Sequence, residues 1–363
     1  MKRKRVFTVL SVLLFLCTAQ FCFAVKILKG PYLQDVAISK ITVCWETDAP
    51  SSGTVFYSLA GNKEAQLSSA KTIEKSPHHC LLLEKLSPST EYDYWVETDG
   101  IKSKIYRFRT AKTKGEDFRF VAYGDSRSNE FFHRQIMGGI TSEKPDLILN
   151  TGDIVNKGEE LPGWDMFFRV ADDIMHTTPY YVALGNHEGN HENYFHYFSF
   201  PNNERWYSFD YAGSHFIALD TNMPSRVDPD QMKWLKKDLA ANKDADFIFV
   251  FFHHPPYSSS VKRGSDPHLQ KLFSGVFEKY GVNIVFNGHD HFYERALIGN
   301  VVYVITGGGG ASLYEVGRSE WTKYSESVYH YTVINVSGGK LKLEAKTIDG
   351  KTIDSFTMTS KKK

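Results

Sequence analysis

The chain has 363 residues and a formal net charge of +1, and 42% of its residues are hydrophobic. This length and composition suffice for one large and one small buried core, so we expect two domains. Removal of residues 1–24 would take away four basic residues and no acidic ones, which changes the formal charge to −3. The remaining chain therefore lacks the basic footprint of a nucleic-acid-binding protein.

The first 24 residues have the pattern of a signal peptide. A basic stretch at residues 2–5 precedes an apolar run at residues 6–16, and the small residue Ala24 fits a cleavage site. A membrane anchor is the alternative, but the apolar run is shorter than the ~20 residues that a spanning helix needs. We therefore expect cleavage after residue 24, a secreted or periplasmic protein, and no transmembrane span in the mature chain.

Residues 25–112 have the pattern of an all-β sandwich, because short alternating segments are separated by turns. The predicted strands are residues 41–47, 53–59, 80–86, 91–98 and 103–110. The alternation assigns Val43 and Trp45 to the core and directs Cys44 and Cys80 outward. In an oxidising compartment these two cysteines either form a cross-strand disulfide or remain free thiols.

A polar linker at residues 110–116 precedes a change of pattern. Apolar strands then alternate with helical stretches, which is typical of an α/β domain. The predicted helices are residues 130–143, 163–176, 230–242 and 267–280. We assign residues 116–335 to this domain and residues 336–363 to C-terminal β-strands and a basic tail.

Polar side chains follow five apolar strands of the predicted α/β domain. Buried strands of such a domain bring their carboxyl ends to a common edge, where these side chains would meet. The candidate ligands are Asp125, Asp153, Asn186, His253, His289 and His291. Each motif alone is more typical of a turn, but five in succession favour a site for borderline divalent or trivalent metal ions. A carboxylate that bridges two such ions would suit displacement at phosphorus.

The same segments carry a family resemblance. Residues 124–125, 152–153, 185–188, 253 and 288–291 resemble the calcineurin-like metallophosphoesterases, and the motif at residues 289–295, His-x-His-x-Tyr-Glu-Arg, is similar to that of the purple acid phosphatases. Residues 30–34, 42–47 and 86–94 resemble the fibronectin-type-III-like domain that precedes their catalytic domain. The resemblance implies a four-layer α/β fold, in which two β-sheets are flanked by helices.

The resemblance also implies the role of each candidate. It implies two metal ions, the first bound by Asp125 and His291, the second by Asn186, His253 and His289, and both by Asp153. The ions would be iron, zinc, manganese or similar, and a hydroxide between them would attack phosphorus. His187 would lie beside the phosphate as a hydrogen-bond donor and general acid. Apart from the resemblance, Asn156, His254 and Glu188 are further candidates, either as metal ligands or as residues that support the ligands.

The chain departs from purple acid phosphatases at several positions. Asn156 replaces the tyrosine that binds ferric iron, and Arg127 replaces a glycine where the wider family often has a metal-binding histidine. A guanidinium cannot serve as an ordinary ligand, so we expect Arg127 to bind phosphate oxygens or to form a salt bridge with a nearby carboxylate. Lys262 and Arg263 stand where the relatives have substrate-facing histidines, and they are candidates for substrate binding.

These features predict a secreted phosphoesterase with two metal ions that acts on small phosphate esters. Hydrolysis of phosphomonoesters is the first expectation, and a phosphodiesterase or nucleotide hydrolase is the alternative on the same site. An alternative of another class is a binding protein that uses its fibronectin-III-like domain and carries an inactive metal domain. The sequence does not determine the oligomeric state.

Overall fold

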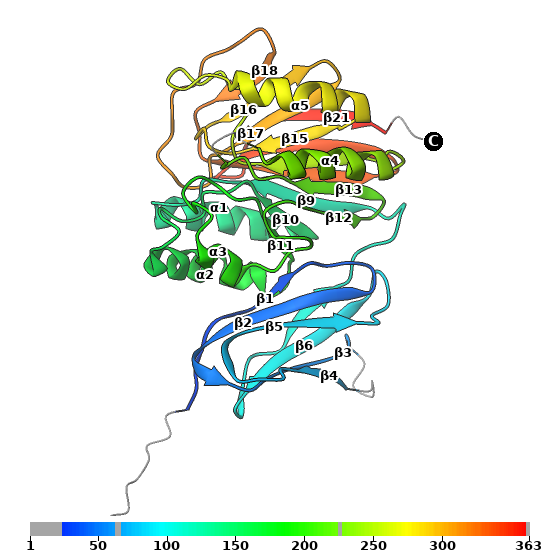
Figure 1. Ribbon diagram of the computed structural model, residues 1–363, viewed down its shortest axis with the longest axis vertical. Coiled ribbons are helices and arrows are strands. Elements are labelled where there is room, and N and C mark those ends of the chain that lie inside the picture. Colours follow the sequence, from blue (N-terminus) through cyan, green and yellow to red (C-terminus); the bar gives the residue numbers. More distant parts are fainter. Residues whose placement is uncertain (1–23, 62–66, 224–226, 361–363) are drawn as a thin grey trace, which may run out of the picture.

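The computed structural model describes residues 24–61, 67–223 and 227–360. The predicted signal peptide, except for Ala24, lies outside these residues. The described chain forms a small N-terminal domain of strands and a larger domain of strands and helices (Figure 1). None of its helices is long and apolar enough to cross a membrane.

The N-terminal domain consists of two antiparallel sheets. One has the strand order β1-β2-β5, and the other has the order β4-β3-β6-β7, with β8 paired to β6. The strands are β1 Ile27–Gln34, β2 Lys40–Ser51, β3 Gly53–Leu59, β4 Ser68–Lys71, β5 Ser76–Glu84, β6 Glu91–Thr98, β7 Ile101–Lys102 and β8 Tyr106–Arg109. The prediction of an all-β domain is confirmed, whereas its fibronectin-III likeness stays a prediction.

The larger domain contains a six-stranded and a seven-stranded sheet. The six-stranded sheet has the order β11-β10-β9-β19-β20-β21, and the seven-stranded sheet has the order β12-β13-β14-β15-β17-β16-β18. The first sheet comprises β9 Phe118–Tyr123, β10 Leu147–Asn150, β11 Tyr180–Val182, β19 His330–Ser337, β20 Lys340–Thr347 and β21 Thr352–Thr359. The second comprises β12 Tyr207–Tyr211, β13 Ser214–Ala218, β14 Ile248–Phe252, β15 Ile284–Asn287, β16 Tyr293–Ile298, β17 Val301–Thr306 and β18 Thr322–Glu326. Because β19 pairs with β9, the C-terminal strands share the sheet of the predicted domain at residues 116–335.

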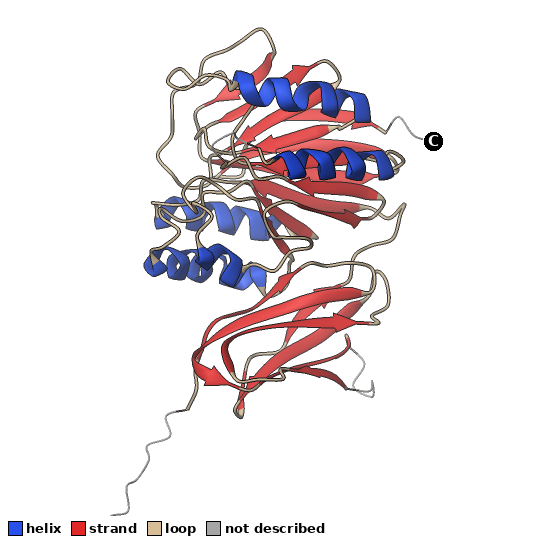
Figure 2. Cartoon of the chain, viewed as in Figure 1, coloured by secondary structure: helices blue, strands red, loops and turns tan. Residues whose placement is uncertain are grey.

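The two sheets pack against each other through aromatic side chains. Phe120 on β9 contacts the rings of Phe216, Phe249 and Phe286 in the other sheet, with ring centroids 4.9–6.0 Å apart. The helices lie outside the sheets (Figure 2). They are α1 Glu130–Glu143, α2 Leu161–Met175, α3 Glu192–Tyr197, α4 Pro229–Ala241 and α5 Pro267–Tyr280. The predicted α/β sandwich is therefore confirmed.

Local sequence explains the ends of the helices. Asn129 caps α1 by accepting a hydrogen bond from the backbone N–H of Phe132. Asp266 caps α5 in the same way, and Gly281 ends that helix with a left-handed φ of 74°. Both helices have the bounds that the sequence predicts.

The orientation predicted for Cys44 is wrong. Cys44 is fully buried and forms a disulfide with Cys80. Its sulfur lies near Gln34, whose side chain donates to the backbone oxygen of Tyr197 in the larger domain (3.0 Å). The alternation in β2 correctly separates the side chains of the small domain's core from those on the opposite face of the sheet. The larger domain covers that opposite face, so Cys44 is buried as well.

Further hydrogen bonds join the two domains. Tyr181 on β11 accepts from the backbone N–H of Val36 (2.9 Å) and also contacts the backbone oxygen of Val36. Tyr94 on β6 donates to the backbone oxygen of His176, at the end of α2 (2.8 Å). The small domain therefore contacts β11, which precedes the loop of Asn186, and the end of α2, which follows the loop of Asp153.

Candidate metal centre

The predicted ligands lie in loops that follow β9, β10, β11, β14 and β15. The backbone of Asp125, Asp153 and His289 is left-handed, with φ between 57° and 69°, which non-glycine residues rarely adopt. Such strained residues cluster at functional sites.

Glycines allow the ligand loops to approach one another. A Cβ atom on Gly288 would lie 2.5 Å from Oδ2 of Asp125, and one on Gly185 would lie 2.3 Å from the backbone nitrogen of Asp153. Both distances are shorter than any normal contact. The glycine before Asn186 and the glycine before His289 are therefore required by the packing of the site.

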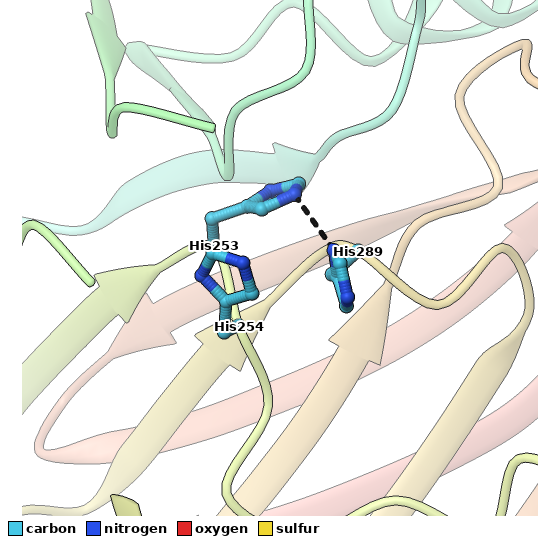
Figure 3. Close-up of side chains that lie close together, drawn as sticks. All are labelled: His253, His254 and His289. Carbon is cyan, nitrogen blue, oxygen red and sulfur yellow. Dashed lines mark hydrogen bonds between the residues drawn. The ribbon is translucent and has the colours of Figure 1, made fainter. Parts of the chain in front are cut away.

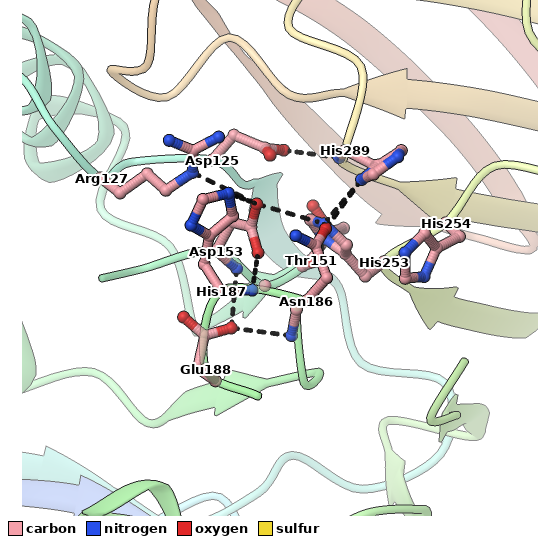
Figure 4. A network of polar contacts seen from close by, with 12 residues as sticks. Asp125, Arg127, Thr151, Asp153, Asn186, His187, Glu188, His253, His254 and His289 are labelled. Atoms are coloured by element: carbon pink, nitrogen blue, oxygen red, sulfur yellow. Dashed lines mark hydrogen bonds and ion pairs between the residues drawn. The ribbon is translucent and has the colours of Figure 1, made fainter. Parts of the chain in front are cut away.

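Three acceptor atoms converge at the predicted second metal position. Oδ1 of Asn186 lies 3.0 Å from Nε2 of His253 and 2.9 Å from Nδ1 of His289, and these two nitrogens are 3.2 Å apart. His253 directs its Nδ1 to the backbone oxygen of Thr151 (2.9 Å), which leaves Nε2 with a lone pair in the neutral ring. Oδ2 of Asp153 lies 3.3 Å from the same Nε2 (Figure 4).

The electrostatics of this position favour one positive charge, which a proton on Nε2 of His253 supplies when no metal ion is bound. Burial by itself raises the pKa of Asp153, but His253 and His187 outweigh it and hold that pKa well below its usual range. Burial lowers the pKa of His253, but the Asp153 carboxylate outweighs it and raises the pKa to about 9. Burial and the neighbouring His253 hold the pKa of His289 far below its usual range, which keeps a lone pair on that ring.

Acceptors also face each other at the predicted first metal position. Oδ1 of Asp125 lies 3.3 Å from Nε2 of His291, whose Nδ1 is directed to the backbone oxygen of Ser312 (2.7 Å). Oδ1 of Asp125 is buried, and no hydrogen-bond donor among the described residues reaches it. Oxygen and nitrogen donors of this kind suit borderline divalent or trivalent ions, so the residues at both positions fit metal ions.

Arg127 lies at the first position, in contact with the ligands. Its Nε is 3.3 Å from Oδ2 of Asp153, and its Nη2 is 3.5 Å from Nε2 of His291. Its Nη1 donates to Oγ of Ser128 (3.2 Å), which in turn donates to Oδ1 of Asn156. Of the two roles expected for Arg127, the structure contains the salt bridge to a carboxylate.

Glu188 joins two of the ligand loops. Its carboxylate is fully buried and accepts hydrogen bonds from the backbone N–H groups of Asp153, Ile154, Val155 and Gly185, at 2.7–3.2 Å. Burial and the nearby charge of Asp153 raise the pKa of Glu188 to about 7. Glu188 therefore orients the loops that follow β10 and β11, and within the described chain no hydrogen bond or ion pair joins its carboxylate to the side chain of a candidate ligand.

His187 and His254 lie at opposite sides of the cluster. Nδ1 of His187 is 2.6 Å from the backbone oxygen of Asn156, and its Nε2 is 3.8 Å from Oδ2 of Asp153. His254 shares a group with His253 and His289 whose ligand atoms lie within 4.8 Å of one another (Figure 3). Nδ1 of His254 also contacts the hydroxyl of Thr221 (2.8 Å), which suits a supporting role.

The two basic candidates differ in position. Arg263 donates to the backbone oxygen of His289 (2.8 Å) and to the hydroxyl of Tyr314 (3.1 Å). It also lines a cavity of about 420 Å³ beside His254 and His289. Lys262 is exposed, and within the described residues no hydrogen bond or ion pair joins its side chain to a candidate ligand.

Sequence reasoning missed Tyr314. Its ring stacks on His291 with the centroids 4.1 Å apart, and it also contacts the guanidinium of Arg263. Tyr314 lies in the segment between β17 and β18, where no motif or periodicity marks it. Ser312, which orients His291 through its backbone oxygen, lies in the same segment.

Two family models match the chain. Residues 118–293 match the calcineurin-like phosphoesterase family, and residues 32–110 match the purple acid phosphatase N-terminal domain. The chain is 26% identical to probable inactive purple acid phosphatase 1 of Arabidopsis thaliana, over 77% of this chain and 57% of that protein. It is 28% identical to acid phosphatase type 7 of Mus musculus, over 70% of this chain and 67% of that protein.

The solved structures include a similar fold. Purple acid phosphatase PPD1 of yellow lupin, Lupinus luteus, superposes with a TM-score of 0.81 and covers 91% of this chain and 74% of its own, at 22% identity. The chain spans little more than half the length of the first Arabidopsis relatives that it matches.

Proposed function

Because the chain joins a calcineurin-like phosphoesterase domain to a purple acid phosphatase N-terminal domain, we propose that it is a metal-dependent phosphoester hydrolase. The observation that carries the proposal is the convergence of Asn186, His253 and His289, whose acceptor atoms lie 2.9–3.2 Å apart beside Asp153. Neutral imidazoles and an amide oxygen repel at such distances unless a cation or a proton lies between them.

We assign two ions to this centre. Asp125 and His291 would hold the first, Asn186, His253 and His289 the second, and Asp153 would contact both. Bound ions of this kind supply an activated water as the nucleophile and neutralise charge on the transferring phosphoryl group. Iron, zinc and manganese all suit the donor set.

His187 is the candidate general acid. The backbone oxygen of Asn156 can only accept a hydrogen bond, so Nδ1 of His187 carries a proton. Its Nε2 faces Asp153 at 3.8 Å, at the edge of the cluster. A second proton on Nε2 would be needed for the ring to donate to a phosphate oxygen or to the leaving oxygen.

Arg127 supplies a fixed positive charge at the same edge. Only 13% of its side chain is exposed, and its fork matches the geometry of phosphate oxygens. Matching the charge of the transition state accelerates the reaction more than matching that of the ground state. With both metal positions filled, we expect Arg127→Ala to lower kcat/KM by roughly ten- to a thousandfold, the loss expected for one charged donor.

The preferred substrate is a phosphomonoester in an extracellular or periplasmic compartment. The cavity of about 420 Å³ beside His289 and Arg263 would receive the alcohol group of a small ester. This compartment follows from the predicted signal peptide, and the disulfide between Cys44 and Cys80 agrees with it.

Hydrolysis of p-nitrophenyl phosphate and of bis(p-nitrophenyl) phosphate by the metal-reconstituted protein tests the proposal. We expect release of nitrophenol from the monoester, loss of activity with a chelator, and recovery when the metal is restored. Faster turnover of the diester would identify a phosphodiesterase instead. Absence of turnover on either substrate, with both ions bound, would favour the alternative of a binding protein with an inactive metal domain.

A further inference from the structure

We propose that the Arg127 guanidinium competes with the first metal ion for the same ligand atoms, so that the two metal positions differ strongly in affinity. The inference rests on the proposed two-ion centre and adds an unequal occupancy that depends on one residue. The first position would fill only at higher metal concentration.

The contacts of Arg127 place a cation at the first position. Oδ2 of Asp153 and Nε2 of His291 are both proposed metal ligands, and the guanidinium approaches them at 3.3 and 3.5 Å. Both partners are almost fully buried, so water screens the interaction little. A metal ion that binds these atoms must displace the guanidinium or tolerate its positive charge nearby.

Arg127 is also held in this place. Ser128 accepts from Nη1 of Arg127 and donates to Oδ1 of Asn156. The backbone N–H of Arg127 donates to the backbone oxygen of Asp153 (3.2 Å). Asn156 stands at the position of the metal-binding tyrosine in the resembling family. Arg127 and Asn156, two positions at which the chain departs from the purple acid phosphatases, are thus connected, since one supplies a cation and the other helps to fix it.

Arg127 approaches the second position only through the shared ligand Asp153. Within the described chain, the hydrogen bonds and ion pairs of the side chains of Asn186, His253 and His289 involve no lysine or arginine. Arg263 contacts His289 only through its backbone oxygen. The second position therefore keeps three of its four ligands clear of Arg127 and should fill first.

Titration of the metal-free protein with Mn²⁺ tests the proposal, with free Mn²⁺ followed by electron paramagnetic resonance. The wild type should bind one ion tightly and a second at least about tenfold more weakly, because of the nearby positive charge. Arg127→Ala and Arg127→Met should each tighten the weak step by about tenfold or more and the tight step by clearly less, since Arg127 contacts two ligands of the first position and only the shared Asp153 of the second. Arg127→Met keeps most of the side-chain volume, so it separates the loss of charge from the loss of packing.

Two further variants assign the steps. Asn156→Ala should tighten the weak step by less than Arg127→Met, because it only frees the fork. Asn186→Ala should remove the tight step and leave the weak one. The tight step of each Arg127 variant reports that its centre is folded.

The outcomes separate the inference from the proposed function. A weak step that is unchanged in both Arg127 variants overturns the inference, as do two equally tight steps in the wild type. If no variant binds Mn²⁺, the inference and the two-ion centre both fail. If the titrations behave as expected but the loaded protein hydrolyses no phosphate ester, the inference stands and the proposed function fails.

Discussion

The backbone N–H of His289 donates a hydrogen bond to Oδ2 of Asp125 at 2.9 Å. Asp125 follows β9 in the six-stranded sheet, whereas His289 follows β15 in the seven-stranded sheet. One carboxylate therefore ties the ends of the two sheets together through Oδ2 and directs Oδ1 toward His291. The position of the loop that carries His289 and the first metal position therefore depend on the same side chain.

Asp125→Asn should separate these two tasks. The amide oxygen can still accept from His289, but the negative charge at the first metal position is lost. We expect affinity for the first ion to fall by more than about tenfold, while the free energy of unfolding of the metal-free protein changes by no more than about 1 kcal/mol. Calorimetric metal titration and urea unfolding measure the two effects. Asp230→Asn, at an exposed position on α4, is the matched control.

Asp153→Ala should reduce binding of both ions and abolish phosphatase activity, because Asp153 is the proposed bridge. Asn186→Ala should empty mainly the second position. Metal content per chain, measured by plasma mass spectrometry after dialysis, distinguishes the two variants. Full occupancy of both positions in Asp153→Ala would contradict the bridging assignment.

Glu188→Gln should destabilise the fold. The carboxylate accepts four backbone hydrogen bonds, but the NH₂ group of glutamine cannot accept from the N–H groups that face it. Leaving one or two buried donors unpaired costs about 1–3 kcal/mol each. Urea unfolding of Glu188→Gln should show this loss, whereas Glu159→Gln, at an exposed position, should behave as the wild type. Equal stability of the two variants would show that the fold does not need the hydrogen bonds of the Glu188 carboxylate.

The environment of His215 should make the free energy of unfolding depend on pH. It is buried between Asp210 and Asp238, each 2.7 Å from one ring nitrogen. Burial lowers its pKa, but the two carboxylates outweigh it and raise the pKa to about 9. The charged ring therefore stabilises the fold below its ordinary pKa of about 6.5, and the contribution is lost as the pH rises through about 9.

The comparison of wild type with His215→Gln measures this contribution. The difference in the free energy of unfolding should be on the order of 2 kcal/mol at pH 6 and should shrink as the pH approaches 10. Asp210→Asn removes one of the two partners and should give a smaller change in the same direction. A difference that is constant with pH would refute the charge-based explanation.

Iron should not make the protein purple. Asn156 offers no phenolate, and its Oδ1 accepts from Ser128. Three other tyrosines near the ligands have different partners, since Tyr293 donates to Asp354 (2.8 Å), Tyr123 contacts His133 and Tyr180, and the hydroxyl of Tyr314 accepts from Arg263 (3.1 Å). The visible spectrum of the ferric-loaded protein should lack a phenolate-to-iron band. Such a band in the wild type would show that one of these tyrosines reaches the metal.

The sequence predicts the elements and ligands that local patterns define. The bounds of α1 and α5 follow from capping residues and a 3.6-residue period, whereas α3 has only six residues, too few for a period to be recognised. The six candidate ligands could be identified because an Asp, Asn or His follows the end of each of five apolar strands. Tyr314 could not be found in this way, because a segment without regular structure places it. Cys44 was assigned wrongly because alternation within one domain says nothing about the surface of the next.

The hydrogen bonds from Tyr181 to Val36 and from Tyr94 to His176 make the catalytic half dependent on its neighbour. A shortened protein that begins at the linker would expose to solvent the surface of the larger domain around Tyr197, which the small domain covers. The hydroxyl of Tyr181 and the backbone oxygen of His176 would lose their partners. The buried face would then favour self-association over folding. Exchange of the N-terminal domain for that of a relative should therefore yield soluble protein only when the matching surface of the larger domain is exchanged with it.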